Sequence, residues 1–442
     1  MDSVIADIRP ASIGRAGISH VARARSVFEE LFLKLAENYV GAFPAHSFDF
    51  VFDGREIPRI GTSAHAIRVR IARSKEVFRR ICLEGSLGLG ETYCEGLIDV
   101  ADRDYKEFLH IFVRTIYNNR NLLFRPNVLV RHIPIVLSRF VRTKLMVNPF
   151  RKRDQAGDIN SHYSLDEWFA DEDAANEFFL SWLHSPYPQY SCAHWDESTP
   201  DLESAQRNKF ERFARHLGLD RAAGDKSLLD LGCGWGGWIL WVNDRTGLPC
   251  TGITLARSQA RHIHREISLR EDPRVRVLTQ NVHDMEGAYD YITSFDMLEH
   301  IDDYDSLIRR THECLKPGGV ALFQAGFDDD RIRKLDPFLE KYIFPGATIP
   351  NIDRIARIFR RHFPGVEVVP LGKFDYAKTI DAWYARFCRN QERIASILAT
   401  KSGVRDVEFS LRVFKHYLAL SSAALGAKKG ARAHYIVARK GT

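Results

Sequence analysis

Four glycines follow a short apolar stretch in the middle of the chain. LLDLGCGWGG begins at Leu228 and contains Gly232, Gly234, Gly236 and Gly237, and the apolar stretch WILWV comes next. Glycine lets the backbone bend tightly and approach a ligand closely, and the N-terminus of a following helix attracts negative charge. The pattern predicts either a nucleotide-type ligand site or only a tight turn between a strand and a helix.

The next apolar run indicates that the ligand of this glycine turn is not a dinucleotide. A dinucleotide site needs an Asp or Glu about 20 residues further on, at the end of the second strand, to hold the ribose. The stretch from Gly252 to Gln259 reads GITLARSQ and contains no acidic residue. The sequence therefore argues against a dinucleotide cofactor.

Several further motifs follow at the spacing of strands in a sheet. TGITLARSQ, TSFDMLEHI and CLKPGGVALFQ, together with the glycine turn, resemble a class I S-adenosylmethionine-dependent methyltransferase. Adding LEGSLGLGETYCEG, QYSCAHW, KYIFPGATIP and FDYAKTIDAWYARF, the chain resembles the cyclopropane-fatty-acyl-phospholipid synthase family from about Glu84 to Tyr417. The resemblance implies methyl transfer from S-adenosylmethionine to the double bond of an unsaturated fatty acyl chain in a membrane phospholipid. The product would be a cyclopropane or a methyl- or methylene-branched chain.

The resemblance also implies which residues hold the cofactor. Thr254 and Gln259 take the place of the missing acid, because both are neutral hydrogen-bonding groups able to meet ribose hydroxyls. The pair His162-Tyr163 lies about ten residues too early for the lid position where the family has such a pair, which predicts a remodelled lid or an insertion at 163–177. The full set of implied cofactor-binding residues is Tyr190, Ser191, Asp230, Gly232, Cys233, Gly234, Trp235, Thr254, Leu255, Gln259, Gln280, Asn281 and Val282.

The chemistry requires a base as well as a methyl donor. Attack by an alkene on a sulfonium methyl leaves a carbocation, which aromatic faces can stabilise and which must then lose a proton. In the family the base is a bicarbonate ion gripped by Cys, Glu, His and Tyr, and the matching positions here are Cys192, Glu299, Gln324 and Tyr376. Gln324 stands where the family has His, and it can donate a hydrogen bond but cannot carry a proton. The use of bicarbonate is therefore left open, with Glu299 or water as the alternative base. Ser421 also replaces a Cys of the family.

The elements that must position these residues change in kind along the chain. Helical stretches alternate with short strand-like ones in the first third, and from Ser227 onward short apolar runs alternate with helical stretches, which is typical of a doubly wound, mostly parallel sheet. The fold class is thus α/β, a Rossmann-like methyltransferase domain with a smaller N-terminal α+β domain of lipid-binding type. The expected parts are a flexible arm (1–24), the α+β domain (25–147), a linker (148–162) and the methyltransferase domain with an acyl-chain tunnel (163–442).

The positive charge of the chain is concentrated in its first third. The net charge is +6, and the stretch from Arg114 to Arg153 holds ten basic residues, no acidic residue and many apolar ones. Such a stretch suits an anionic membrane surface, or it is an ordinary basic face above a core. Nucleic acid is not expected, because no reading motif is present.

The composition fixes the remaining expectations. Hydrophobic residues make up 45% and charged residues 27%, which is typical of a globular protein, and no apolar run is long enough to span a membrane. Seven scattered cysteines without a CxxC motif favour free thiols in a reducing compartment, and no metal-binding histidine motif is found. We therefore expect a cytoplasmic enzyme at the inner face of the membrane, without a metal. The sequence leaves a homodimer open.

Two other functions remain open at this point. The chain could methylate a soluble small molecule, as plant alkaloid N-methyltransferases that resemble the family do, or it could be a lipid-binding protein whose catalytic site has decayed. Structural roles are also open for two of the catalytic candidates: Glu299 at a helix end and Cys192 as a small buried residue. Binding of the cofactor would separate an enzyme from a decayed site.

Overall fold

The computed structural model describes most of the chain. The described residues are 26–118, 157, 162–163, 165, 168–169, 171–183, 186–219, 225–270, 274–330, 332–427 and 430–442. The arm expected at 1–24, nearly all of the linker expected at 148–162 and the basic stretch beyond 118 lie outside the described residues.

The first part of the chain forms a four-stranded sheet covered by helices. Its strand order is β2-β1-β3-β4, with β1 parallel to β3 and the other two pairs antiparallel. In β3 the residues Ile67, Val69 and Ile71 are buried and the arginines between them are exposed, so one face of the sheet packs on the helices and the other faces solvent. The elements are α1 (Val27–Ala42), β1 (Phe48–Phe52), β2 (Arg55–Glu56), β3 (Ile67–Ile71), α2 (Ser74–Glu84), α3 (Ser86–Cys94), β4 (Ile98–Val100) and α4 (Asp102–Asn118).

The second part is built on a seven-stranded sheet. Its order is β12-β13-β9-β8-β5-β6-β7, in which the strands from β9 to β7 are parallel to one another. At one edge β13 is antiparallel to both of its neighbours, β9 and β12, so β12 runs in the same direction as the parallel strands. The doubly wound, mostly parallel sheet expected from the sequence is confirmed. Its strands are β5 (Leu228–Leu231), β6 (Cys250–Thr254), β7 (Val275–Thr279), β8 (Tyr289–Phe295), β9 (Leu315–Phe327), β12 (Gly365–Pro370) and β13 (Arg432–Arg439), and a separate pair is β10 (Arg333–Lys334) with β11 (Thr348–Ile349).

Helices cover both faces of this sheet, because neighbouring residues of each strand point to opposite sides. Leu228 belongs to the core shared with α8, α9 and α10, whereas Leu229 belongs to the core shared with α11 and α13. The bounds of the helices in this part are α7 (Glu172–Leu180), α8 (Leu202–Leu217), α9 (Gly237–Thr246), α10 (Arg257–Ser268), α11 (Tyr304–Cys314), α12 (Pro337–Tyr342), α13 (Ile352–His362), α14 (Asp375–Arg389), α15 (Gln391–Lys401) and α16 (Val407–Leu425). Two 3-10 helices, Val282–Asp284 and Leu298–His300, follow β7 and β8.

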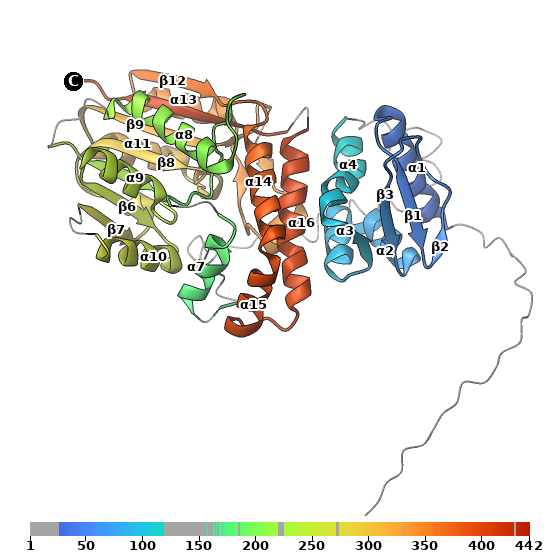
Figure 1. Cartoon of the computed structure of the whole chain (residues 1–442). Helices are drawn as coiled ribbons and strands as arrows, with labels where there is room; N and C mark the ends of the chain where they lie inside the picture. Colours follow the sequence, from blue (N-terminus) through green and yellow to red (C-terminus); the bar gives the residue numbers. More distant parts are fainter. Residues whose placement is uncertain are drawn as a thin grey trace, which may run out of the picture.

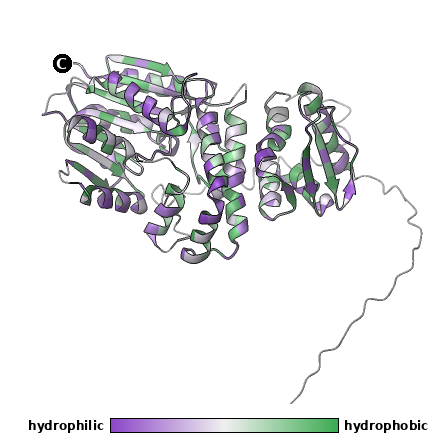
Figure 2. Cartoon of the chain, in the orientation of Figure 1, coloured by the Kyte–Doolittle hydropathy of each residue, from purple (hydrophilic) through white to green (hydrophobic). Residues whose placement is uncertain are grey.

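Helix α16 lies between the two sheets (Figure 1) and is buried along most of its length. Its one side packs on α14 and its other side packs on α3 and α4. Tyr105 of α4 bonds to His416 of α16 at 2.5 Å, and Lys415 pairs with Asp102 at 2.8 Å. Figure 2 shows the largely apolar character of α16 compared with the polar outer helices. The N-terminal sheet is therefore attached to the helices that border the candidate site.

The glycines of LEGSLGLGETYCEG make this attachment close. A Cβ atom on Gly90 of α3 would fall 2.2 Å from the ring of Phe338 in α12 and 2.8 Å from Nε2 of His416. Only glycine fits at this helix crossing.

No helix among the described residues is long and apolar enough to cross a membrane.

Candidate active site

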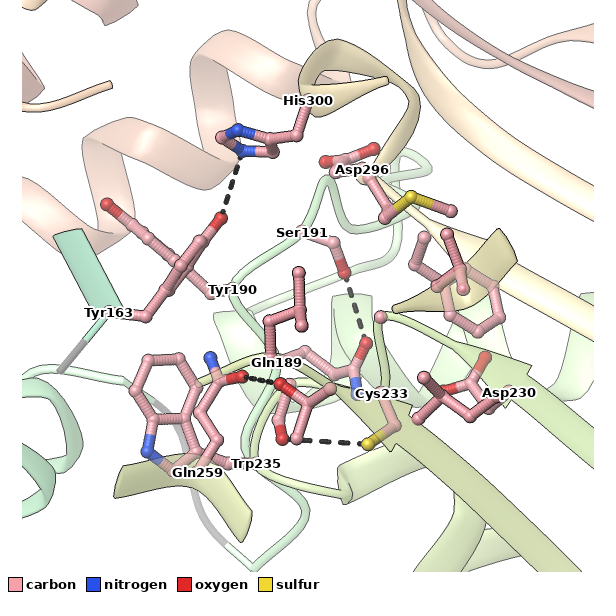
Figure 3. A pocket seen from close by; sticks show the side chains of 18 of the residues that line it. Tyr163, Gln189, Tyr190, Ser191, Asp230, Cys233, Trp235, Gln259, Asp296 and His300 are labelled. Carbon is pink, nitrogen blue, oxygen red and sulfur yellow. Dashed lines mark hydrogen bonds between the residues drawn. The ribbon is translucent and has the colours of Figure 1, made fainter. Parts of the chain in front are cut away.

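A cavity lies at the carboxyl ends of the parallel strands, where doubly wound sheets bind their ligands. All but two of the predicted cofactor-binding residues line it. Figure 3 shows from close by Tyr190, Ser191, Asp230, Cys233, Trp235 and Gln259 among them. The predicted residues in its wall are Tyr190, Ser191, Asp230, Gly232, Cys233, Gly234, Trp235, Thr254, Leu255, Gln259 and Val282. The two others, Gln280 and Asn281, do not line the cavity. Gln280 donates to the carbonyl of Asp284, and the side chain of Asn281 caps the 3-10 helix after β7.

The glycine turn forms the floor of this cavity. Gly232 and Gly234 have φ angles of 73° and 56°, in the left-handed region that favours glycine. A Cβ on Gly232 would lie 2.8 Å from Met297, whereas a Cβ on Gly234 would have no heavy atom within 4 Å. The open space beside Gly234 is what a ligand lying against the backbone requires.

Asp230 stands at the end of β5, just before the turn. Its carboxylate accepts a hydrogen bond of 2.7 Å from the hydroxyl of Thr293. Burial raises the pKa of Asp230 to about 7, against the hydrogen bond from Thr293 and the charge of Lys209. On the next strand, the Thr254 hydroxyl donates to Oε1 of Gln259 at 2.8 Å, and both residues line the cavity.

The lid of the cavity contains residues that the sequence did not assign to it. Asn176 of α7 accepts a hydrogen bond of 2.9 Å from the Trp235 indole and donates one of 2.7 Å to the carbonyl of Ser258. Tyr163 lines the cavity and lies 3.4 Å from Nε2 of His300. The expectation that the pair His162-Tyr163 lies too early in the chain for the lid is therefore wrong for Tyr163, whereas the expected remodelling or insertion at 163–177 stays a prediction. Spacing along the chain gave the wrong position for Tyr163, because Tyr163 before α7 and Tyr190 after it line the same cavity.

Lys209 is a buried cation beside the same cavity. Its Nζ donates to the hydroxyl of Ser191 at 2.8 Å and to the Gln189 side chain at 3.4 Å. Burial lowers the pKa of Lys209 to about 8, although the charges of Asp296 and Asp230 act in the opposite direction. The lysine fixes the Ser191 hydroxyl and places positive charge near two buried carboxyl groups.

Three of the four predicted catalytic residues, Cys192, Gln324 and Tyr376, donate hydrogen bonds to one carboxyl group, that of Asp296 in TSFDMLEHI. Oδ2 of Asp296 accepts from the backbone N–H of Cys192 at 2.8 Å and from the Tyr376 hydroxyl at 2.8 Å. Oδ1 of Asp296 accepts from Nε2 of Gln324 at 3.2 Å. The Cys192 thiol points away and donates to the carbonyl of Ala193, and burial raises its pKa well above the usual value. Cys192 therefore contributes its backbone amide to this cluster.

Glu299 completes the cluster from the 3-10 helix after β8. Its Oε1 accepts from the Gly326 N–H at 2.8 Å, and its Oε2 is buried without a hydrogen-bond partner among the described residues. Burial raises the pKa of Glu299 to about 8, and the neighbouring charge of Asp296 acts in the same direction. Burial also raises the pKa of Asp296, but the hydrogen bonds from Cys192 and Tyr376 oppose the rise. Asp296 thus accepts three hydrogen bonds that favour its ionised form, whereas Glu299 accepts one.

A second, mostly apolar cavity adjoins the first. Four residues line both: Tyr163, Tyr190, Asp296 and His300. Glu299, Gly326 and Tyr376 lie in the wall of the second cavity, and so does Ser421 of α16. Further apolar and aromatic lining residues are Leu335, Leu339, Phe344, Ile349, Ile380, Trp383, Tyr417, Ala424 and Leu425. Asp296 therefore lies where the two cavities meet, and Glu299 lies beside it in the wall of the second.

The doubly wound sheet, the glycine turn and the cavity at the strand ends define a class I S-adenosylmethionine-dependent methyltransferase. The family model of the mycolic acid cyclopropane synthetases matches residues 151–431, and the chain belongs to this family. The resemblance inferred from the motifs is thereby confirmed, and a protein without enzymatic activity is not favoured.

Curated relatives and solved structures agree with this assignment. The chain is 29% identical over 372 residues to the cyclopropane-fatty-acyl-phospholipid synthase of Escherichia coli (strain K12), which covers 83% of this chain and 86% of that protein. Cyclopropane mycolic acid synthase 1 of Mycobacterium tuberculosis is 27% identical, over 55% of this chain and 86% of its own length.

Two solved structures share the fold. A mycolic acid cyclopropane synthase complexed with SAH and CTAB has a TM-score of 0.54 at 22% identity, over 65% of this chain and 99% of its own. Coclaurine N-methyltransferase, bound to N-methylheliamine and SAH, has a TM-score of 0.58 at 19% identity, over 81% of this chain and 99% of its own.

Asp296, Lys209, Tyr163 and His300 are the site residues that the sequence did not assign. A signal was available for Asp296, since it follows the buried strand β8 and polar residues at that edge face the ligand site in doubly wound sheets. No comparable signal existed for Lys209, because its helix reads as an ordinary amphipathic one. Among the residues that the structure describes, no group of His, Cys, Asp or Glu side chains is placed to hold a metal ion.

Proposed function

We propose that this enzyme transfers the methyl group of S-adenosylmethionine to the double bond of an unsaturated acyl chain in a phospholipid, giving a cyclopropane or a methyl- or methylene-branched chain. The observation that best supports this proposal is that the two cavities join. The first cavity contains the glycine turn and the polar side chains of Asp230, Thr254 and Gln259, and is called the polar cavity below for these groups. It meets the second, apolar cavity at Tyr163, Tyr190, Asp296 and His300. An alkene in the apolar cavity can reach a methyl donor in the polar one only at this junction.

The polar cavity suits S-adenosylmethionine on the chemistry of its walls. The open space beside Gly234 accommodates a ligand against the backbone, and Thr254 with Gln259 offers neutral hydrogen-bonding groups for a ribose. The methionine end would lie near Ser191, which Lys209 holds in place. When bound, S-adenosylmethionine supplies an electrophilic methyl group, and the chain supplies orientation and exclusion of water.

Aromatic side chains at the junction suit a short-lived cation. Tyr163, Tyr190, Trp383 and Tyr417 all line the apolar cavity, and the hydroxyl of Tyr190 donates to that of Tyr417 at 2.7 Å. Aromatic faces attract cations by their electron-rich π-systems, and this attraction strengthens where water is excluded. The apolar cavity thus supports an unsaturated hydrocarbon as the substrate and is a poor match for a soluble amine.

Two observations favour a phospholipid at an anionic membrane surface. Arg333, which pairs with Asp328, and the exposed Lys334 belong to the wall of the apolar cavity and could meet a phosphate headgroup. The basic and apolar sequence between Arg114 and Arg153 suits binding at the inner face of the membrane. Reversing Arg139, Arg142 and Lys144 together should weaken co-sedimentation with anionic vesicles at low salt and leave cofactor binding unchanged.

The decisive experiment is turnover of a defined monounsaturated phospholipid in vesicles with S-adenosylmethionine, with products resolved by gas chromatography and mass spectrometry. We expect the acyl chain to gain one CH2 and, for a cyclopropane, to lose its double bond. Matched vesicles of a fully saturated phospholipid should give no product. Methylation of a soluble amine with no change in the unsaturated lipid would refute the proposal.

A further inference from the structure

The side chain of Asp296 occupies the point on which the other polar groups of the junction converge. Three donors form hydrogen bonds with its carboxylate: the backbone N–H of Cys192, the hydroxyl of Tyr376 and the side-chain amide of Gln324. Three of the four positions that the family resemblance assigns to bicarbonate are thus engaged with a carboxylate of the chain itself. In Figure 3, Asp296 and His300 lie at the upper end of the polar cavity, and Trp235 and Gln259 lie at the lower end.

The chain holds Asp296 in this position at a conformational cost. Its φ angle is 46°, in the left-handed region that only a few non-glycine residues among the described ones adopt. The backbone N–H of Asp296 donates to the carbonyl of Gln324 at 2.9 Å. Gln324 of β9 therefore forms hydrogen bonds with both the backbone and the side chain of Asp296. Strained residues that persist in a structure cluster at functional sites, which agrees with the place of Asp296 at the junction.

Gln324 suits an internal carboxylate. Its Nε2 also donates to the carbonyl of Cys192 at 3.1 Å, so both neighbours of this nitrogen are acceptors and the opposite orientation of the amide would set oxygen against oxygen. A neutral donor at this position satisfies the Asp296 carboxylate without competing for its proton. The departure from His at position 324 and the presence of Asp at position 296 are therefore parts of one arrangement.

We propose that the carboxylate of Asp296 is the catalytic base of this enzyme and takes the place of an external bicarbonate ion. The inference rests on the proposed function and names the group that completes its reaction. Asp296 lines both cavities, so its carboxylate faces the place where the methyl donor and the double bond meet.

The balance of the step requires only a proton acceptor. The π pair of the alkene forms the new bond to the methyl carbon, the methyl–sulfur bond breaks with its pair remaining on sulfur, and one positive charge is left on the acyl chain. A C–H proton then passes to the Asp296 carboxylate. For a cyclopropane, the C–H bond is one of the transferred methyl group and its electron pair closes the ring. For a methylene product, a hydride first shifts from the methyl-bearing carbon to the neighbouring cationic carbon, and the electron pair of a methyl C–H bond then forms the new double bond. No oxidant or reductant is needed in either case.

The test compares anion dependence in the wild type and in Asp296→Gly, with the vesicle assay in buffer freed of carbon dioxide. Glycine is the favoured residue at a positive φ, so this variant should fold and should bind S-adenosylmethionine as the wild type does. We expect the wild type to keep its rate without bicarbonate. The variant should lose at least about 100-fold in rate, the usual size of a general-base contribution. Added bicarbonate or formate should restore a substantial part of it by filling the space left by the carboxylate.

Two further variants sharpen the result. Asp296→Asn fills the same space without a base, so it should be slow and should not respond to added anions. Asp302→Gly, the same change at an exposed position shortly after the 3-10 helix, should behave as the wild type. The inference is overturned if the wild type requires bicarbonate, if Asp296→Gly remains fast without anions, or if it binds cofactor normally and no anion rescues it. A wild type inactive on every unsaturated lipid would instead overturn the proposed function.

Discussion

Burial of the Glu299 carboxyl predicts that the cofactor-free protein loses stability as the pH rises through neutrality. Burial raises the pKa of Glu299 to about 8 in the folded state from its ordinary value of 4.5. Between these values the folded protein keeps a proton that the unfolded chain releases, so unfolding releases a proton and becomes more favourable at higher pH. The stabilising contribution is complete below pH 4.5 and is lost as the pH approaches 8.

The magnitude follows from one proton per molecule. A single group contributes about 1.4 kcal/mol per pH unit inside this window, so the free energy of unfolding should fall by about 2 kcal/mol between pH 6 and pH 7.5 from Glu299 alone. Glu299→Gln keeps the shape and the hydrogen bond from Gly326 but removes the titration. The free energy of unfolding of this variant, measured relative to that of the wild type, should therefore rise by about 2 kcal/mol between pH 6 and pH 7.5.

Urea unfolding followed by tryptophan fluorescence measures this difference at the two pH values. Glu30→Gln changes an exposed carboxylate of α1 and is the matched control, which should keep the wild-type pH slope. The buried Asp230, whose pKa is raised to about 7, adds to the slope in every variant and cancels in the comparison. An equal slope in the wild type and in Glu299→Gln would show that Glu299 does not hold a proton in the folded protein.

Three other substitutions test the packing around the site. Gly234→Val should abolish binding of S-adenosylmethionine in calorimetry, whereas Gly54→Val, which also has a positive φ and open space, should not; normal binding by the first would refute the cavity assignment. Gly90→Val should lower the free energy of unfolding by about 1–3 kcal/mol, because its side chain would collide with α12; an unchanged urea midpoint would contradict this packing. Asn176→Ala removes the buried partner of the Trp235 indole and should weaken cofactor affinity about tenfold, and unchanged affinity would mean that the lid does not depend on this bond.

Local patterns in the sequence were sufficient for the sheet and for one wall of the site. The apolar runs SLLDLG, CTGITL, VRVLTQ, YDYITS and GVALFQ correspond to β5, β6, β7, β8 and β9. Glycines that need a positive φ identified the turn at Gly232 and Gly234. These features are readable because each depends on the conformational preferences of a few consecutive residues. The motif order was also enough to name the family.

The tertiary structure alone decided what surrounds the reacting atoms. Asp296 could be recognised as the centre of the cluster only when Cys192, Gln324 and Tyr376, from three distant segments, were seen to donate to its carboxylate. The placement of Tyr163 in the lid likewise depends on how the chain returns around α7, which residue spacing does not encode. Hydrogen bonds and burial between segments far apart in the sequence depend on the whole packed fold, and they set how many hydrogen bonds each buried carboxyl group accepts. The sequence thus determined the class of the enzyme, whereas the packing of its segments determined the position of its candidate base.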